Sequence, residues 1–242
     1  MRVLVTGATG FIASHLIPAL ATAGHDVIAA GHDRGRIPSG ATALVLDLAA
    51  PDWPTLPEVD AVVHLAQANV PFPDGAAALF AVNTASTQRL LEHARLTGAR
   101  QFVLASSGSV YGTSEGPLAE SSPLAARDFY SATKVAAERL VGAYDQHFGT
   151  TTLRLFVPYG PGQVRRMLPR LVDRIRSGEP ILLNRGGRPR LNPIYVDDVS
   201  RVVIRALDGD GGAGVLNVAG DDVTDIRAVS ELIGEVIGSE PT

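Results

Sequence analysis

The sequence predicts an α/β protein in which a doubly wound parallel sheet carries a small C-terminal lobe. Three observations support this fold class: short apolar runs alternate with helical patterns, glycines follow the first run, and the alternation breaks after Val157. Apolar strands that alternate with amphipathic helices indicate βαβ units. Their right-handed crossovers give a parallel sheet that is covered by helices on both faces.

The first half of the chain supplies most of the predicted sheet. Strands are expected at residues 3–5, 27–30, 43–46, 60–65, 101–105 and 151–157. Helical spacing of apolar residues predicts a first helix from Phe11 to Leu20, which Gly24 ends. Longer helical patterns cover about residues 75–97 and 128–147, and Gly98 and Gly149 follow them.

The second half differs, because Pro158, Gly160, Pro161 and Gly162 interrupt the alternation. Helices are expected over residues 165–177, 196–207 and 225–237, and a strand over 215–218. The first of these helices holds five arginines, which are typical of a solvated face and could also contact phosphate. We therefore predict a sheet domain at residues 1–157 and a small lobe, interleaved with returning sheet elements, at 158–242.

Composition excludes several classes of protein. The 242 residues are 45% hydrophobic with a net charge of −4, enough for one sizeable core but not for a basic nucleic-acid-binding face. The absence of cysteine excludes disulfides, a cysteine nucleophile and thiolate-ligated metal, and we predict no metal site. Neither a membrane-spanning apolar run nor a signal-peptide pattern is present, so we expect a cytoplasmic protein without membrane or nucleic-acid partners.

Residues 6–13, TGATGFIA, form a glycine-rich loop between the first strand and the first helix. Gly7 permits a tight turn, Gly10 clears the path to a phosphate, and Ala13 lets the helix pack closely on the strand. This placement favours a dinucleotide pyrophosphate site over an ordinary strand–helix turn. The residues predicted to contact the cofactor here are Gly7, Thr9, Gly10, Phe11 and Ile12.

The end of the second strand leaves the choice between NAD and NADP open. Gly31 stands where an acidic residue normally grips the ribose hydroxyls. Asp33 could substitute for it, or His32, Arg34 or Arg36 could meet a 2′-phosphate; a polar surface turn is the alternative without a ligand. Asp47 and Leu48 close the third strand, where Asp47 could meet the adenine amino group or cap a helix.

Tyr130 and Lys134 are four residues apart, and therefore lie on one face of the predicted helix. A tyrosine with a pKa of about 10 is too weak a base at neutral pH, but a neighbouring ammonium and a cationic nicotinamide favour the phenolate. Ser107 follows the strand at 101–105 and could donate a hydrogen bond to the reacting oxygen. Together the three side chains predict a hydride-transfer site, with Lys134 also holding the nicotinamide ribose.

These motifs resemble those of the extended short-chain dehydrogenase/reductase family, in its NAD-dependent epimerase/dehydratase group. The resemblance rests on TGATGFIASHL at 6–16, HLA at 64–66, SSGSVYG at 106–112, YSATK at 130–134, RLFVPYGPG at 154–162, IYVDDV at 194–199 and LNVAG at 216–220. It implies a Rossmann-type fold, a C-terminal substrate lobe and catalytic roles for Ser107, Tyr130 and Lys134, with Ser106 the less favoured serine.

The resemblance also implies further site residues. Leu65, Ala66, Gln67, Phe156, Val157 and Pro158 would line the cofactor, and Asn83 would help to order the site. We also assign substrate contacts to Asn69, Ser109 and Arg190. Five arginines could meet a diphosphate or could equally be solvated: Arg165, Arg166, Arg170, Arg188 and Arg190. The resemblance also implies a homodimer through the helix at 83–96 and the helix that carries Tyr130; burial of their apolar residues within the monomer is the alternative.

Departures from the family pattern reduce the number of reactions that the sequence allows. Gly108 and Ser109 stand where sugar-nucleotide 4,6-dehydratases carry Asp and Glu, so the carboxylates for eliminating water are missing. Val157 replaces an asparagine that often contacts the diphosphate sugar. The chain stops at Thr242, soon after its last predicted helix, which suggests a smaller or more open substrate pocket.

Three functions remain at this point. The first is an NAD(P)-dependent sugar-nucleotide epimerase that oxidises a secondary alcohol transiently and re-reduces it. The second is an NAD(P)H-dependent ketoreductase or dehydrogenase of a small carbonyl compound, which the turn at Gly31 and Arg34 favours. The third is a non-catalytic NAD(P)-sensing protein, which would need neither Tyr130 nor Lys134.

Overall fold

The computed structural model describes residues 1–114, 116–183, 190–209 and 214–241. The chain forms two compact units. Unit 1 comprises Met1–Leu155 with Asp197–Val218, and unit 2 comprises Phe156–Val196 with Ala219–Thr242. The predicted boundary between a sheet domain and a C-terminal lobe at residue 157 stays a prediction.

Unit 1 is built on a parallel sheet, which confirms the predicted fold class. In the described ranges the sheet has seven strands in the order β3-β2-β1-β4-β5-β6-β9, and every neighbouring pair is parallel. Their bounds are β1 Arg2–Thr6, β2 Asp26–Gly31, β3 Thr42–Val45, β4 Ala61–His64, β5 Gln101–Ser107, β6 Gly149–Leu155 and β9 Gly214–Val218. The central strands are apolar and buried because helices cover both of their faces.

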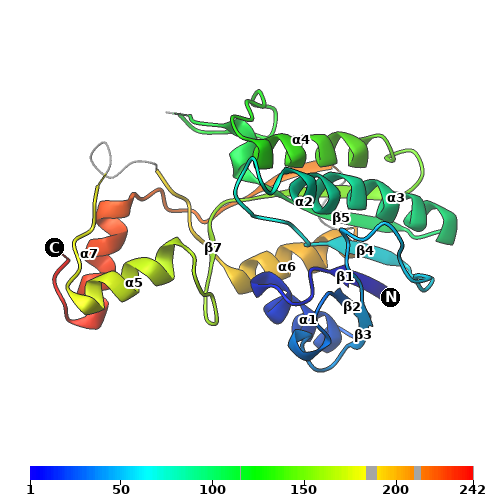
Figure 1. Cartoon of the computed structure of the whole chain (residues 1–242), viewed down its shortest axis with the longest axis horizontal. Helices are drawn as coiled ribbons and strands as arrows, with labels where there is room; N and C mark the ends of the chain where they lie inside the picture. Colours follow the sequence, from blue (N-terminus) through cyan, green and yellow to red (C-terminus); the bar gives the residue numbers. More distant parts are fainter. Residues whose placement is uncertain (115, 184–189, 210–213, 242) are drawn as a thin grey trace. The chain divides into compact units, whose positions relative to one another are not determined.

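Two groups of helices cover this sheet (Figure 1). On one face lie α2 (Ala76–Phe80), α3 (Ser86–Thr97) and α4 (Phe129–Gly142), and on the other lie α1 (Phe11–Thr22) and α6 (Val196–Leu207). The main core includes Leu90 and Leu91 from α3, Ala137 and Val141 from α4, and Phe102 from β5. Two short 3₁₀ turns, η1 (Arg34–Arg36) and η3 (Gly108–Tyr111), follow β2 and β5.

The long helix predicted at 75–97 is continuous but not regular. A π turn, η2 (Ala81–Ala85), separates α2 from α3 and contains Asn83. Such widened turns often occur at functional sites, and sequence periodicity does not reveal them.

The helix predicted to reach residue 147 ends at Gly142, so that prediction is wrong for its last five residues. Asp128 starts α4 with a capping box that includes Ser131. Beyond Gly142 the chain turns, and Tyr144 stacks on Phe148 with ring centroids 5.9 Å apart. This packing against the core directs the chain back into β6 earlier than the apolar pattern suggests.

Unit 2 contains α5 (Met167–Ser177) and α7 (Ile226–Ile237), which pack against each other. The start predicted for α5 is two residues early, because Arg165 has a positive φ of 56° and Arg166 is the N-cap. A short parallel pair, β7 (Pro158–Tyr159) and β8 (Ile194–Tyr195), was not predicted. In the part of the chain that the structure describes, no helix is long and apolar enough to cross a membrane.

Candidate active site

The loops after β1 and β4 meet at the point where the chain winding reverses. The two strands are neighbours, while the connections from β1 lead to β2 and those from β4 lead to β5. Ligands of doubly wound sheets bind in the crevice at the carboxyl ends of such strands. Gly7 has φ +71°, and a Cβ there would lie 2.7 Å from the Ala66 nitrogen. Only glycine therefore allows the two loops to approach this closely.

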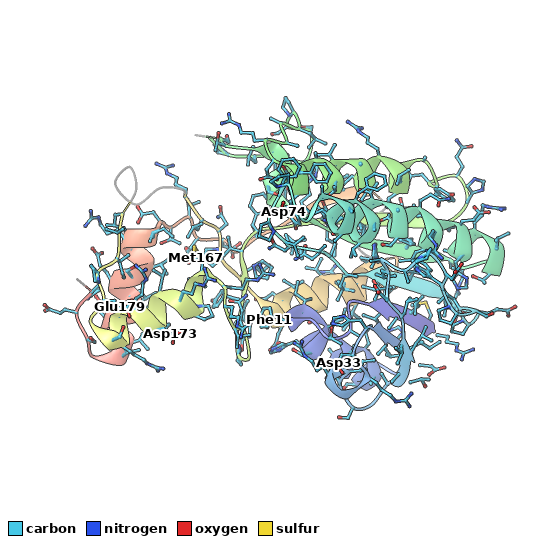
Figure 2. The ribbon with its side chains drawn as sticks, in the orientation of Figure 1. Phe11, Asp33, Asp74, Met167, Asp173 and Glu179 are labelled. Atoms are coloured by element: carbon cyan, nitrogen blue, oxygen red, sulfur yellow. The ribbon has the colours of Figure 1, made fainter. Side chains whose placement is uncertain are left out.

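The glycine loop leads directly into α1. Gly10 is the N-cap, and no side chain of the described residues caps this helix. The first-turn N–H groups, which include those of Phe11 and Ile12, are therefore available to an anion. Figure 2 shows Phe11 at the start of α1. This is the local geometry that the sequence predicts for a pyrophosphate.

Gly31, at the end of β2, lies close to the glycine-rich loop. A Cβ on Gly31 would lie 2.9 Å from Thr9 Cγ2, so a side chain at this position would require that methyl group to shift. Asp33 Oδ1 accepts the Gly35 N–H at 3.0 Å and caps η1. Asp33, labelled in Figure 2, and the neighbouring His32 and Arg34 are exposed.

Arg36 and Asp47 complete the predicted adenosine side of the site. Arg36 Nη2 donates to the Thr9 carbonyl at 3.5 Å. Asp47 Oδ1 accepts the Ala49 N–H at 2.9 Å within a turn, and the described chain has no helix between β3 and β4 for Asp47 to cap. Leu48 packs against the core of the sheet.

The helix α4 brings Tyr130 and Lys134 to the carboxyl end of the sheet. The Tyr130 hydroxyl donates to Gln67 Oε1 at 2.7 Å, which places Tyr130 beside the loop that follows β4. Lys134 is 1% exposed, and its Nζ donates to the Ala105 carbonyl of β5 at 2.6 Å. Burial lowers the pKa of Lys134 from 10.5 to about 8, and the charge of Glu138 acts in the opposite direction.

Lys134 is also the only lysine in the sequence; the other 20 basic residues among its Lys and Arg are arginines. Arginine stays charged at any physiological pH and presents a broad fork, whereas lysine presents a compact ammonium whose pKa responds to burial. The use of lysine at this one position agrees with a role that needs a small titratable cation. This signal can be read from the sequence alone. It supports a functional role for Lys134 independently of its spacing from Tyr130.

The structure distinguishes the two candidate serines. Ser106 is buried, and its hydroxyl donates to the Glu138 carboxylate. Ser107 is half-buried, and its Oγ accepts the Ser109 N–H at 3.2 Å, which leaves its hydroxyl proton available. The Ser109 hydroxyl is buried with no partner among the described residues. Ser107 therefore remains the better candidate for contact with a reacting oxygen.

Asn83 supports the loop after β4, as the resemblance implies. Its Oδ1 accepts the Ala68 N–H at 2.8 Å, and its Nδ2 donates to Thr133 Oγ1 at 3.1 Å. Thr133 precedes Lys134 on α4, so the widened turn of η2 ties the loop to the helix with the predicted catalytic residues.

Sequence reasoning gave no structural role to His64, which ends β4. Its Nδ1 lies 2.6 Å from the Thr6 hydroxyl, and its Nε2 lies 3.3 Å from Ser86 Oγ. Burial, with a smaller contribution from the charge of Lys134, lowers the pKa of His64 to about 3. The imidazole is therefore neutral at physiological pH and joins the ends of β1 and β4 to the start of α3.

Other predicted site residues are placed as follows. In unit 1, Leu65 is half-buried, Ala66 is buried, and Gln67 and Asn69 are exposed. Phe156, Val157, Pro158 and Arg190 lie in unit 2, which the structure does not place relative to unit 1, and Arg188 lies outside the described residues. Within the described ranges no group of three His, Asp or Glu side chains could hold a metal ion.

Comparisons with known proteins agree with the fold and the motifs. The model of the NAD dependent epimerase/dehydratase family matches residues 3–219. The chain is 30% identical to the uncharacterized UDP-glucose epimerase YtcB of Bacillus subtilis, with 100% of this chain and 84% of YtcB aligned. It is 31% identical to the UDP-glucose 4-epimerase of Mycolicibacterium smegmatis, with 99% and 83% aligned.

Solved structures give the same result. MoeE5 in complex with UDP-glucose and NAD has a TM-score of 0.86 and 31% identity, over 100% of this chain and 83% of MoeE5. The UDP-glucuronic acid 4-epimerase of Bacillus cereus in complex with NAD has a TM-score of 0.88 and 27% identity, over 100% and 85% of the chains. The protein is thus an enzyme of the NAD dependent epimerase/dehydratase family.

Proposed function

We propose that this enzyme is an NAD-dependent epimerase of a UDP-sugar. The observation that carries the proposal is the grouping of Tyr130 and Lys134 on α4, with Ser107 at the end of β5 and no carboxylate at positions 108 and 109. Acid/base groups for moving a hydroxyl proton are present, whereas the carboxylates for eliminating water are absent from these positions. The relatives named above act on, or are solved with, UDP-glucose or UDP-glucuronic acid.

Each side chain has a separate task in this proposal. NAD, when bound, accepts and returns a hydride. Tyr130 takes the proton of the substrate hydroxyl and gives it back, Lys134 favours the phenolate by its charge, and Ser107 donates a hydrogen bond to the reacting oxygen. The N–H groups at the start of α1 hold the pyrophosphate of the cofactor.

A labelled substrate tests the reaction. UDP-glucose or UDP-glucuronic acid carrying deuterium on C4 is incubated with the enzyme and NAD, and the products are read by NMR. We expect the C4 epimer with its deuterium retained, because the same hydride returns to the sugar. Tyr130→Phe should lower the rate at least about 100-fold while NAD binding persists. Failure of the wild type to form an epimer from either sugar, or a fully active Tyr130→Phe, would reject the proposal.

A second candidate is an NADPH-dependent carbonyl reductase, which one observation favours. The end of β2 lacks an acidic residue, Asp33 caps η1, and the neighbouring side chains of His32, Arg34 and Arg36 are exposed. A reductase would oxidise NADPH in proportion to the product, and would show no epimer when supplied with a UDP-sugar and NAD.

The expected homodimer remains a proposal that light scattering tests. Leu96, in the helix assigned to that interface, and Phe80, shortly before it in α2, are 69% and 54% exposed in the single chain. A monomer at micromolar concentration would contradict it.

A further inference from the structure

Tyr130 has a side-chain partner to which the proposed mechanism assigns no task. Its hydroxyl donates a hydrogen bond to Gln67 Oε1 at 2.7 Å, although the two residues are 63 positions apart. The resemblance implies only a cofactor contact for Gln67. The contact nevertheless connects Gln67 directly to the oxygen atom that would exchange a proton with the substrate.

The backbone on both sides of Gln67 is fixed. On one side the Ala66 N–H donates to Thr6 Oγ1 at 3.4 Å, and a Cβ on Gly7 would collide with that segment. On the other side Ala68 donates to Asn83 Oδ1 and accepts from Asn83 Nδ2, at 2.8 and 3.2 Å. A residue between two fixed neighbours can present its side chain in a reproducible position.

The second anchor also connects Gln67 to the helix of its partner. Asn83 Nδ2 donates to Thr133 Oγ1, and Thr133 Oγ1 in turn donates to the Tyr130 carbonyl at 2.7 Å. The loop that carries Gln67 and the helix turn that carries Tyr130 are therefore held by the same polar side chains. Their relative position does not depend on the Gln67–Tyr130 contact alone.

A primary amide suits a partner whose proton comes and goes. Its oxygen accepts from a neutral phenol, and its NH₂ group can donate to a phenolate after a rotation of the side chain. A carboxylate only accepts, and would repel a phenolate. A thioether of similar length neither donates strongly nor carries charge.

We propose that Gln67 is a positioning residue for proton transfer at Tyr130, accepting from the phenol and donating to the phenolate in alternation. This inference rests on the proposed function. In the oxidation step the substrate O–H bond breaks and its proton passes to Tyr130 Oη, while the hydrogen on the same carbon leaves with its electron pair to NAD. In the return step both hydrogens go back to the sugar, to the oxygen and to the opposite face of the carbon.

Tyrosine ionisation tests this without any sugar. The ultraviolet absorbance of phenolate is followed with pH, and the curve of Tyr130→Phe is subtracted to isolate Tyr130 from the other four tyrosines. In Gln67→Glu we expect the Tyr130 midpoint to rise by about one unit or more, because the new carboxylate opposes the phenolate. The matched control is Gln88→Glu, the same change at an exposed position of α3, which should leave the midpoint unchanged.

The kinetic readout should follow the titration. The acid limb of kcat/KM against pH should move to higher pH in Gln67→Glu by the same amount as the midpoint. Gln67→Met keeps the length of the side chain, and we expect a loss in kcat of about tenfold with a smaller change in KM.

Separate results would reject the role of Gln67 and the epimerase function. An unshifted Tyr130 midpoint in Gln67→Glu, or an unchanged kcat in Gln67→Met, would overturn the role of Gln67 even in an active epimerase. A wild type that forms no epimer while the midpoint shifts as expected would overturn the function and leave the Gln67–Tyr130 pairing in place.

Discussion

The carboxylate of Glu138 and the guanidinium of Arg154 form an ion pair with 2.7 Å between Oε2 and Nη2, and each side chain is only 5% exposed. Arg154 also donates from Nη1 to Tyr111 Oη at 2.6 Å. Tyr111 in turn donates to Asn217 Oδ1 at 2.7 Å. The pair therefore joins α4, one helical turn beyond Lys134, to the ends of β5, β6 and β9.

Breaking this ion pair should destabilise the protein strongly. In Glu138→Gln the buried guanidinium loses its counter-charge, and we expect the free energy of unfolding to fall by about 3–5 kcal/mol. Urea denaturation followed by circular dichroism measures the change. Glu92→Gln removes the exposed partner of Arg95 and serves as the control, with little effect expected. Equal losses in the two variants would contradict this account.

Charged Lys134 should lower the free energy of unfolding, although its side chain is needed for turnover. Its folded pKa of about 8 lies below its ordinary value of 10.5, so the unfolded chain binds the extra proton between these pH values. Stability should therefore rise with pH across this window, and the charged form costs about 3 kcal/mol below it. In Lys134→Met we expect turnover to fall at least about 100-fold, while stability at pH 7 is kept or increased.

The single lysine makes the underlying pKa directly measurable. Labelling with isotopic lysine gives one side-chain NMR signal, and its titration should be centred near pH 8. A midpoint near 10.5 would show that burial does not perturb this ammonium.

Acid should destabilise the protein through His64. Its folded pKa of about 3 lies below the ordinary 6.5, so the unfolded chain binds the extra proton as the pH falls through this window. The loss contributed by His64 begins below pH 6.5 and should reach about 3 kcal/mol at pH 4.5. His64→Gln should remove this part of the pH dependence, and His32→Gln, at an exposed position, should not. Urea denaturation at pH 7 and pH 4.5 compares them, and parallel losses in all three proteins would exclude His64 as the source.

Val157 should be replaceable with a gain in stability. It has φ +47°, a left-handed conformation that is costly for a β-branched residue and tolerated by asparagine. We expect Val157→Asn to raise the free energy of unfolding by about 1 kcal/mol. Val164→Asn is the control, because Val164 does not have a positive φ. The melting temperatures of the two variants test this prediction. A lower melting temperature for Val157→Asn than for the wild type would contradict it.

The elements that sequence reasoning predicted are those with local signals. Strands such as β1 and β5 are short apolar runs bounded by turns, and Tyr130 and Lys134 share a helix face because of their spacing. The glycine loop was equally local, since its residues are consecutive. Such features can be predicted without knowing which segments of the chain meet in space.

The contacts that sequence reasoning missed depend on that knowledge. Gln67 meets Tyr130 across 63 residues, and His64 meets Thr6 across 58. Each pairing follows from the order of parallel strands and from how α4 packs on them, which periodicity does not encode. The pair of Glu138 and Arg154 was missed for the same reason, although a charged residue inside the apolar strand at 151–157 was a visible signal.

The crowding of Gly31 by Thr9 has a consequence for substitutions. An acidic side chain at position 31 would need the methyl group of Thr9 to turn aside or disappear, since only 2.9 Å separate that methyl from a Cβ at position 31. We therefore expect the effect of a side chain at position 31 to depend on the residue at position 9. In a redesign of nucleotide preference, a smaller residue at position 9 would remove this contact before a carboxylate is placed at position 31.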